Sequence, residues 1–370
     1  MSYDAAVRWR LHRASVRTEA APVHAAVWLA FMAGACMLHE PTPDDESEFV
    51  DLYLEDGIEI CGGQLDAYDR FVERIYEFYT GAGPGDFRVA VHAAADPDCD
   101  EGRSCALNGT VWLRQDFAQY HEITHIMQGQ VDGGSIPSLK EGTAESLGPM
   151  APISYGVDWL ADVEPDFLFA STGADVDYPR AAAFTRFVID RWGIDSYRTF
   201  FRAMGELDTA DEDDYRREFE AVFGQPLDDA WPVFLSEPRC AYDFPFCEQR
   251  NPIELPFELN GVDCSEAETL GYDATALDLP SNQVPYLPAT ILHLDNAAPR
   301  TVTLELEYVT IYLGGCGDCA SQEPALLLGS SDNPDFPPIR FDLDLQAGTT
   351  VFFVRSQAGG TSRVSISAAD

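Results

Sequence analysis

The spacing of hydrophobic and polar positions changes along the chain, and each spacing predicts a different kind of element. Residues 49–60 and Phe87–His92 alternate as half-buried strands do, and Thr110–Leu113 predicts a third short strand. Between the first two strands, Gln64–Tyr79 carries its apolar residues at helical spacing along one face. This succession predicts a small sheet with a helix packed against it.

From Asp116 to about residue 235 the spacing is helical. The predicted helices, several of which end near a glycine, are residues 116–128, 138–147, 178–192, 195–204, 212–223 and 227–235. Further on, Thr301–Leu313, Ile339–Leu345 and Thr349–Arg355 are β-rich and are separated by turn residues, which predicts a β-sandwich of roughly a hundred residues. The predicted fold class is therefore α+β, with an all-β C-terminal domain.

These changes divide the chain into five predicted segments. They are an export signal (1–36), an acidic linker (37–48), a sheet-and-helix domain (49–236), a Cys/Pro-rich boundary (237–252) and a β-sandwich-like domain (253–370).

The first segment has the layout of a secretory signal, with four arginines before an apolar run from Ala25 to Ala35. The run is too short to anchor the chain as a transmembrane helix. Two cleavage sites remain open. Ala33-Gly34-Ala35 suits ordinary signal peptidase, whereas Gly34-Ala35-Cys36 resembles a bacterial lipobox, although lipoboxes usually carry Leu at the position of Ala33. Cleavage there would leave Cys36 lipidated as a membrane tether. Both alternatives predict an exported protein, in the periplasm, on the outer membrane or outside the cell.

The charge balance is strongly acidic, with 23 Lys+Arg against 63 Asp+Glu and a formal net charge of −40. Such a charge repels nucleic acid and anionic membrane surfaces, so neither is an expected electrostatic partner. Lys140 is the only lysine in the chain.

Nine cysteines leave an even eight when Cys36 is set aside for lipid, which predicts disulfides in an oxidising compartment. The pairs near enough in sequence to close small loops are Cys99/Cys105 and Cys240/Cys247. Cys316 and Cys319 form a lone C-x-x-C, for which a structural disulfide is favoured over a redox or zinc site.

The main chemical signal is the motif His121-Glu122-Ile123-Thr124-His125. On a helix, His121 and His125 lie one turn apart on the same face and can bind one Zn²⁺. Glu122 is rotated by about 100° from His121, where it can accept a proton from an activated water without binding the metal. The opposite, core-facing side of this helix would carry Phe117, Tyr120, Ile123 and Met127. The alternative, a buried helix with two hydrogen-bonded histidines, is disfavoured by this separation of faces and by the export signal.

Two histidines leave a catalytic zinc in need of a third protein ligand. No histidine follows at the short spacing that metzincins use, but a turn through Gly133-Gly134 would bring Glu141 on the next helix against the motif. Ser138 and Glu141 also have the spacing of a helix capping box, which is the alternative role for Glu141. Glu145 lies one turn further along the same face. It could accept a hydrogen bond from a ligating histidine, lie as a plain surface acid, or replace Glu141 as the third ligand.

With Glu141 as the ligand, the chain resembles the gluzincins, which are zinc peptidases with H-E-x-x-H and a downstream Glu. The likeness is nearest to the aminopeptidase N group, whose ligand lies in a W-L-x-E-G phrase that here reads Ser138-Leu139-Lys140-Glu141-Gly142. The resemblance covers about residues 50–235. It implies a thermolysin-like catalytic domain with a small N-terminal sheet followed by helices.

In that group a tyrosine placed before a helix stabilises the oxyanion, in a phrase like Y-x-x-G-x-A. By resemblance the candidate is Tyr178, with Tyr155 as a weaker alternative and simple packing at a helix start as the alternative role. The G-x-M-E-N phrase that binds a substrate amino terminus has no counterpart, because residues Asn108–Leu113 occupy its place. That segment could still be an edge strand that pairs with a peptide. Aminopeptidase specificity is therefore not implied.

Together these features predict zinc-dependent hydrolysis of a peptide or protein substrate. His121, His125 and Glu141 would hold Zn²⁺, Glu122 would act as general base, and Tyr178 would donate to the oxyanion. Two rival functions remain. One is a non-catalytic exported binding lipoprotein with a structural or degenerate zinc site, and the other is a zinc hydrolase that acts on something other than a peptide.

Overall fold

The structure is a computed structural model of the chain. It describes residues 42–94, 99, 104–113, 120–148, 163–170, 172–207, 211–237, 247, 251–262, 264, 272–273, 289–316, 328–329, 338–356 and 362–369. Residues Pro43–Asp370 form one compact unit. The predicted signal peptide, its lipobox and the first part of the predicted linker lie outside the described residues. No helix within the described ranges combines the length and the apolar composition that a bilayer-spanning segment needs.

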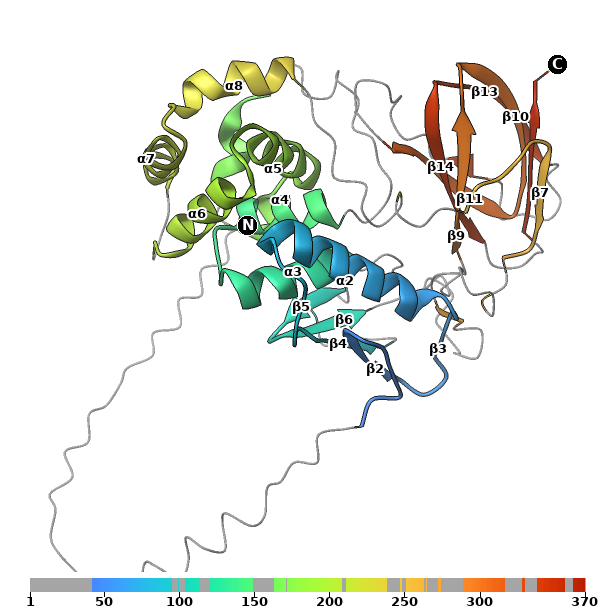
Figure 1. Cartoon of the computed structure of the whole chain (residues 1–370), viewed down its shortest axis with the longest axis horizontal. Coiled ribbons are helices and arrows are strands. Elements are labelled where there is room, and N and C mark those ends of the chain that lie inside the picture. Colours follow the sequence, from blue (N-terminus) through green and yellow to red (C-terminus); the bar gives the residue numbers. More distant parts are fainter. Residues whose placement is uncertain are drawn as a thin grey trace, which may run out of the picture. The chain divides into compact units, whose positions relative to one another are not determined.

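A five-stranded mixed sheet begins the fold (Figure 1). In spatial order its strands are Asp45–Glu46 (β1), Val50–Leu54 (β2), Val89–Ala93 (β4), Thr110–Leu113 (β6) and Cys105–Leu107 (β5). The three central strands run parallel, and the strands at the two edges are antiparallel to their neighbours. The helix Gln64–Thr80 (α2) buries Tyr68, Phe71 and Val72 on the face predicted from its spacing.

The predicted single strand over residues 49–60 is wrong in one respect, because the chain turns in its middle. β2 ends at Leu54, and a turn follows in which Gly57 has a φ of 89°, a value that favours glycine. Glu59–Ile60 (β3) then pairs with Tyr272–Asp273 (β8), far along the chain, and not with the first sheet. Alternation along the sequence cannot distinguish these two short strands from one long strand.

Six helices follow the sheet within the described residues. They are Tyr120–Val131 (α3), Pro137–Leu147 (α4), Tyr178–Trp192 (α5), Ile194–Gly205 (α6), Glu212–Phe223 (α7) and Leu227–Ser236 (α8), with 3-10 turns at Pro165–Phe169 (η3) and Gly173–Asp175 (η4). The bounds of α5 and α7 are those predicted, since Asp177 and Asp211 cap their N-termini with side-chain hydrogen bonds. Packed aromatic rings, among them Phe184, Phe219 and Phe234, form the core between these helices.

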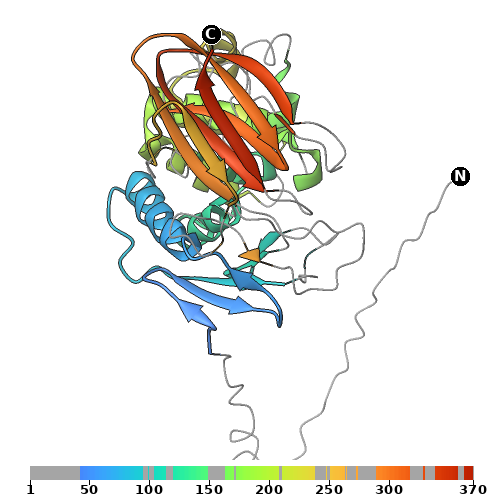
Figure 2. The ribbon, with the colours of Figure 1, turned by 90° about the vertical axis from the view of Figure 1, so that its right-hand side faces the viewer.

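The C-terminal region is β-rich, as predicted, and its described residues include two four-stranded sheets, coloured from gold to red in Figures 1 and 2. One sheet has the order β13-β10-β15-β7, made of Ile339–Leu345, Arg300–Glu307, Arg363–Ala368 and Phe257–Asn260. The other has the order β12-β11-β14-β9, made of Leu328–Gly329, Val309–Cys316, Gly348–Ser356 and Ala289–Asn296. Leu304 and Ile366 from the first sheet share a buried core with Ile311 and Val354 from the second.

The segment Thr301–Leu313, predicted as one β-rich stretch, is divided between the two sheets. Tyr308 has a φ of 52° and separates β10 from β11, so that the chain crosses from one layer to the other. One residue in this conformation is not visible in the hydrophobic pattern.

Two disulfides have both cysteines in the described residues. Cys99–Cys105 closes the small loop predicted from the sequence, and Cys61–Cys264 joins residues that are 203 positions apart. Cys247 is also disulfide-bonded. Cys240 and Cys319 lie outside the described residues, so the pairing of Cys240 with Cys247 and the nature of the C-x-x-C stay predictions. Disulfides of this kind are typical of proteins in oxidising compartments.

Candidate metal centre

Helix α3 carries both histidines of the motif on one side and the core on the other. Tyr120, Ile123 and Met127 are fully buried, as predicted, while Phe117 lies outside the described residues. The side chain of His121 is 5% exposed and that of His125 is 17% exposed. The two imidazole rings lie 4.7 Å apart at 84° to one another, with their Nε2 atoms separated by 3.1 Å. The spacing of one helical turn therefore aims both Nε2 atoms at the same point.

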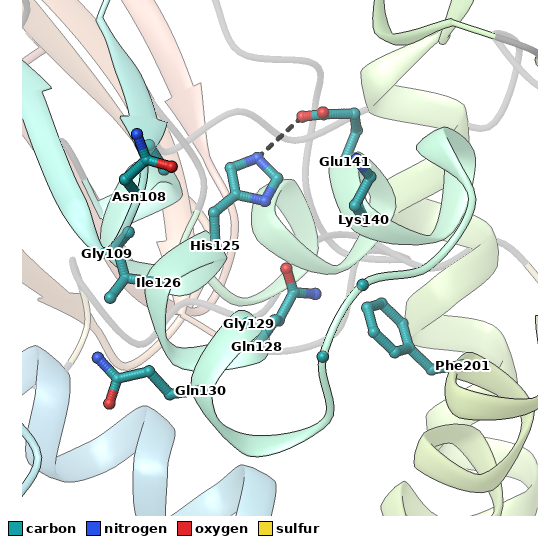
Figure 3. Close-up of a pocket in the computed structure, with 13 residues that line it drawn as sticks. Asn108, Gly109, His125, Ile126, Gln128, Gly129, Gln130, Lys140, Glu141 and Phe201 are labelled. Atoms are coloured by element: carbon teal, nitrogen blue, oxygen red, sulfur yellow. Dashed lines mark hydrogen bonds and ion pairs between the residues drawn. The ribbon is translucent and has the colours of Figure 1, made fainter. Parts of the chain in front are cut away.

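Helix α4 brings the Glu141 carboxylate to this point. Oε2 of Glu141 lies 3.2 Å from Nε2 of His121 and 3.0 Å from Nε2 of His125. Figure 3 shows Glu141 and His125 facing each other from their two helices. The chain between them turns through residues 132–136, and Oγ of Ser135 donates a hydrogen bond to the carbonyl of Phe201 on α6. The turn is thus fixed to a third helix.

His121, His125 and Glu141 could hold a metal ion, because one ligand atom from each lies within 4.8 Å of the other two. Two imidazole Nε2 atoms and one carboxylate oxygen converge on the same point. A cation at the common point satisfies all three donor atoms together.

Glu145 lies behind His121 and not beside the metal ligands. Its Oε2 is 3.1 Å from Nδ1 of His121, and only 2% of its side chain is exposed. A hydrogen bond to Nδ1 holds the ring with Nε2 turned towards Glu141. Of the three roles considered for Glu145, a plain surface acid is therefore wrong, since the side chain is buried. A third-ligand role does not fit a carboxylate on the Nδ1 side of the ring.

Two carboxylates, those of Glu141 and Glu145, contact the ring of His121 and change its pKa. Burial by itself lowers the pKa of this imidazole, but hydrogen bonds with Glu141 and Glu145 outweigh burial and raise the pKa to about 10. Burial raises the pKa of Glu141, and its hydrogen bonds with His121 and His125 outweigh that effect and hold the pKa far below its usual range. The two carboxylates therefore stabilise a positive charge on the His121 ring.

The capping-box role for Glu141 is wrong. Ile136 is the residue that precedes α4, with Pro137 in its first turn, so Ser138 lies inside the helix. Oγ of Ser138 donates to the carbonyl of Leu168 at 2.6 Å. The carboxylate of Glu141 instead reaches the two histidines.

Glu122 and Tyr178 both lie near His121. Glu122 is half-buried in the first turn of α3, and its side chain makes no hydrogen bond with any residue in the described part of the chain. Its negative charge contributes to the raised pKa of His121, so it lies close to that ring. The ring of Tyr178, at the start of α5, lies 5.7 Å from that of His121. Tyr155 lies outside the described residues.

A pocket with a volume of about 480 Å³ opens beside His125 and Glu141 (Figure 3). Its walls come from the β5–β6 turn, α3, α4 and α6, and include Asn108, Gln128, Lys140 and Phe201. Sequence reasoning did not predict Gln128 or Lys140 as site residues. One signal in the sequence could have drawn attention to Lys140, because it is the only lysine of the chain and directly precedes Glu141.

The expected edge strand is displaced by one position in the sheet. Asn108–Leu113 was predicted to lie at the edge, but β6 is paired on both sides, with β4 and with β5. The edge strand is Cys105–Leu107, and Leu107 is 48% exposed. Which strand lies at the edge depends on the order of pairing across the sheet, and the local sequence does not show that order.

Comparisons with known proteins add little to this geometry. No protein-family model and no curated protein matches the chain. Among the solved structures, one match is the pre-peptidase C-terminal domain of a collagenase from Bacillus anthracis, which is 15% identical to this chain. The match covers 33% of this chain and 95% of that domain, with a TM-score of 0.20. A similarity of this size carries no argument about fold or function.

Proposed function

We propose that this protein is an exported zinc-dependent metallopeptidase of the gluzincin type. The observation that carries the proposal is the triangle of ligand atoms on His121, His125 and Glu141, whose sides measure 3.0–3.2 Å. A tetrahedral zinc site with bonds of about 2.0–2.1 Å has ligand–ligand edges of about 3.3 Å. The three donors therefore fit zinc closely. A site with three protein ligands also leaves a position for water, as catalytic zinc sites do and closed structural sites do not.

Zinc bound there would supply Lewis-acid activation of water and of the scissile carbonyl. Glu122 follows His121 directly on α3 and, having no hydrogen-bond partner among the described residues, is available as a general base. It would take the proton of the attacking water and pass it to the leaving amine. Glu145 would hold the ring of His121, and the Tyr178 hydroxyl would donate to the oxygen that becomes negative in the transition state.

A peptide substrate is favoured over other hydrolysable groups by the edge strand beside the pocket. Among the described residues β5 is the last strand of the sheet, with no strand paired to its outer edge, and the Asn108–Gly109 turn that follows it lines the pocket with His125. An extended peptide can add to such an edge through main-chain hydrogen bonds, which position its backbone and leave its side chains to be selected. The sheet, the motif helix and the Glu141 helix follow one another in the order expected of a gluzincin catalytic domain. The disulfides support an exported location.

The test is a Glu122→Gln variant assayed against casein and a peptide library beside the wild-type protein. We expect the variant to keep one zinc per chain and to lose activity by a factor of about 10²–10⁴, the usual contribution of a general base. Zinc content measured in both proteins separates loss of the base from loss of the metal. Full activity in Glu122→Gln would contradict the mechanism. A wild-type protein that binds zinc and cleaves no peptide would favour the rival functions, namely a non-catalytic binding protein or a hydrolase for another substrate.

A further inference from the structure

Lys140 is placed in an unusual way for an acidic protein. It is the only lysine among 370 residues that include 63 acids. It lies in the first turn of α4, where the helix dipole disfavours a cation, next to Glu141 and on the wall of the pocket. The backbone N–H of Lys140 donates to the carbonyl of Ile136, but within the described part of the chain its ammonium group forms no ion pair and no hydrogen bond. A half-buried ammonium group is therefore available to a ligand in the pocket.

Gln128 provides a second and independent observation on the same pocket. The residue is 2% exposed, and neither its Nε2 nor its Oε1 has a hydrogen-bond partner among the described residues. Figure 3 shows the amide pointing from α3 into the pocket, on the side lined by Phe201. Buried amides are nearly always hydrogen-bonded, because an unpaired one costs free energy in the folded protein. An unpaired amide directed into an open pocket indicates a polar group of a ligand.

We propose that Lys140 and Gln128 bind a carboxylate of the substrate next to the scissile bond, and that the peptidase therefore selects acidic substrates. The inference rests on the proposed function and names its substrate class. The ammonium group of Lys140 supplies charge, and the Gln128 Nε2–H₂ donates a hydrogen bond that a carboxylate oxygen accepts. Oε1 of Gln128 is left to accept a backbone N–H of the same substrate residue.

The net charge of −40 does not oppose this selection inside the pocket. Exposed charges further away than about 8 Å are largely screened at physiological ionic strength. Lys140 is adjacent to the group it would bind and is partly shielded from solvent, so its effect is local. A carboxylate near the scissile bond has two sources, the side chain of Asp or Glu and the C-terminal carboxylate of a peptide.

The experiment compares matched peptides in which Glu is replaced by Gln, and Asp by Asn, at each position around the cleaved bond. A second pair compares free with amidated C-termini and so separates the two sources. We expect wild-type kcat/KM to favour the acid by about tenfold to a hundredfold, the effect of one hydrogen bond to a charged group. Lys140→Met should remove this preference, and Lys140→Glu should reverse it, so that the Gln and Asn peptides are cleaved faster than their acidic counterparts. Gln128→Leu should reduce the preference without lowering thermal stability.

The matched control is Arg217→Met, which removes the same charge from the exposed side of α7 and should keep the wild-type preference. Circular dichroism and zinc content verify folding and metal loading in each variant. Equal rates for acid and amide peptides in the wild-type protein would overturn the inference and leave the proposed function standing. If no peptide is cleaved, the proposed function fails, and calorimetric binding of the same peptide pairs to metal-free and zinc-loaded protein decides the inference. Binding that favours the acid in wild type and loses that preference in Lys140→Met supports it, and equal binding of acid and amide overturns it.

Discussion

Oε2 of Glu145 lies 3.1 Å from Nδ1 of His121, with both side chains buried. The contact fixes which ring nitrogen of His121 is left to bind a metal ion. It also places a carboxylate behind the imidazole, which would increase the affinity of that imidazole for a cation. The two residues are 24 positions apart, and the contact exists only because α4 packs against α3.

Glu145→Gln is expected to weaken zinc binding by about 10- to 100-fold, since it keeps a hydrogen-bond acceptor and removes the charge. The apparent dissociation constant, measured by competition with a chromogenic chelator, checks this expectation. Glu141→Gln should have the larger effect because it removes a charged ligand of the metal itself. If Glu145→Gln were the more damaging of the two, Glu145 and not Glu141 would be the third ligand.

Removing the metal should abolish peptidase activity and lower the melting temperature. A ligand that binds only the folded state stabilises it by about 2.7 kcal/mol at a concentration of 100 Kd. Incubation with a chelator followed by zinc should therefore lower and then restore both activity and Tm. In His125→Ala, zinc should produce no such rise in Tm, since two ligands do not form the site. A rise of the wild-type size in that variant would place the metal elsewhere.

The turn between the two site helices is held by a buried ion pair. Nε and Nη2 of Arg198 donate to the two carboxylate oxygens of Asp132 at 2.9 Å, and the Asp132 side chain has no exposed surface. Arg198→Met leaves that carboxylate without its main partner and should lower the free energy of unfolding by about 3–5 kcal/mol. Arg202 also contacts Asp132, but its side chain is 48% exposed, so Arg202→Met should cost less than about 1 kcal/mol. Urea unfolding of the two variants measures both values, and similar losses would contradict this account.

Gly142, which follows Glu141, is required by the close approach of α4 to α5. A Cβ atom there would lie 2.7 Å from Oγ1 of Thr185 and 2.8 Å from the carbonyl oxygen of Ala181. Gly142→Ala should destabilise the protein by about 1–3 kcal/mol through overpacking. Gly129 on α3 is the matched control, because a Cβ added there meets nothing within 4 Å. Gly129→Ala should be neutral or raise stability by up to about 1 kcal/mol through helix propensity. Equal effects on thermal unfolding would contradict the packing argument.

Alkaline pH should unfold the protein through its buried tyrosines. Burial raises the pKa of Tyr197 to about 12 and raises that of Tyr215 as well. An unfolded tyrosine has a pKa of about 10, so the folded state holds these protons more tightly. The resulting stability is present below pH 10 and is lost as the pH rises from about 10 towards 12.

Tyr215→Phe should reduce this alkaline loss, because the hydroxyl of Tyr215 is buried and has no hydrogen-bond partner among the described residues. Unfolding curves between pH 8 and about 11.5, together with tyrosinate absorbance, test the expectation. The idea fails if the variant loses stability over the same range as the wild type does.

The sequence by itself determined the local parts of this protein. The bounds of α5 and α7, the separate core and ligand faces of α3, and the small Cys99–Cys105 loop all depend on residues within a few turns of each other. Periodicity and capping report such relationships directly. Glu141 was predicted as a ligand from a turn at Gly133-Gly134 and from the resemblance to the gluzincins, and the structure brings its carboxylate to the two histidines.

Tertiary structure decided every feature that depends on which elements are neighbours. The Cys61–Cys264 disulfide, the edge position of β5 and the burial of Glu145 against His121 each join parts of the chain whose proximity has no signature in local pattern. The same holds for the pocket in which Lys140 and Gln128 are brought together from two helices. Hydrophobic spacing shows which face of an element is buried, but the partner of that face is selected by packing over the whole fold.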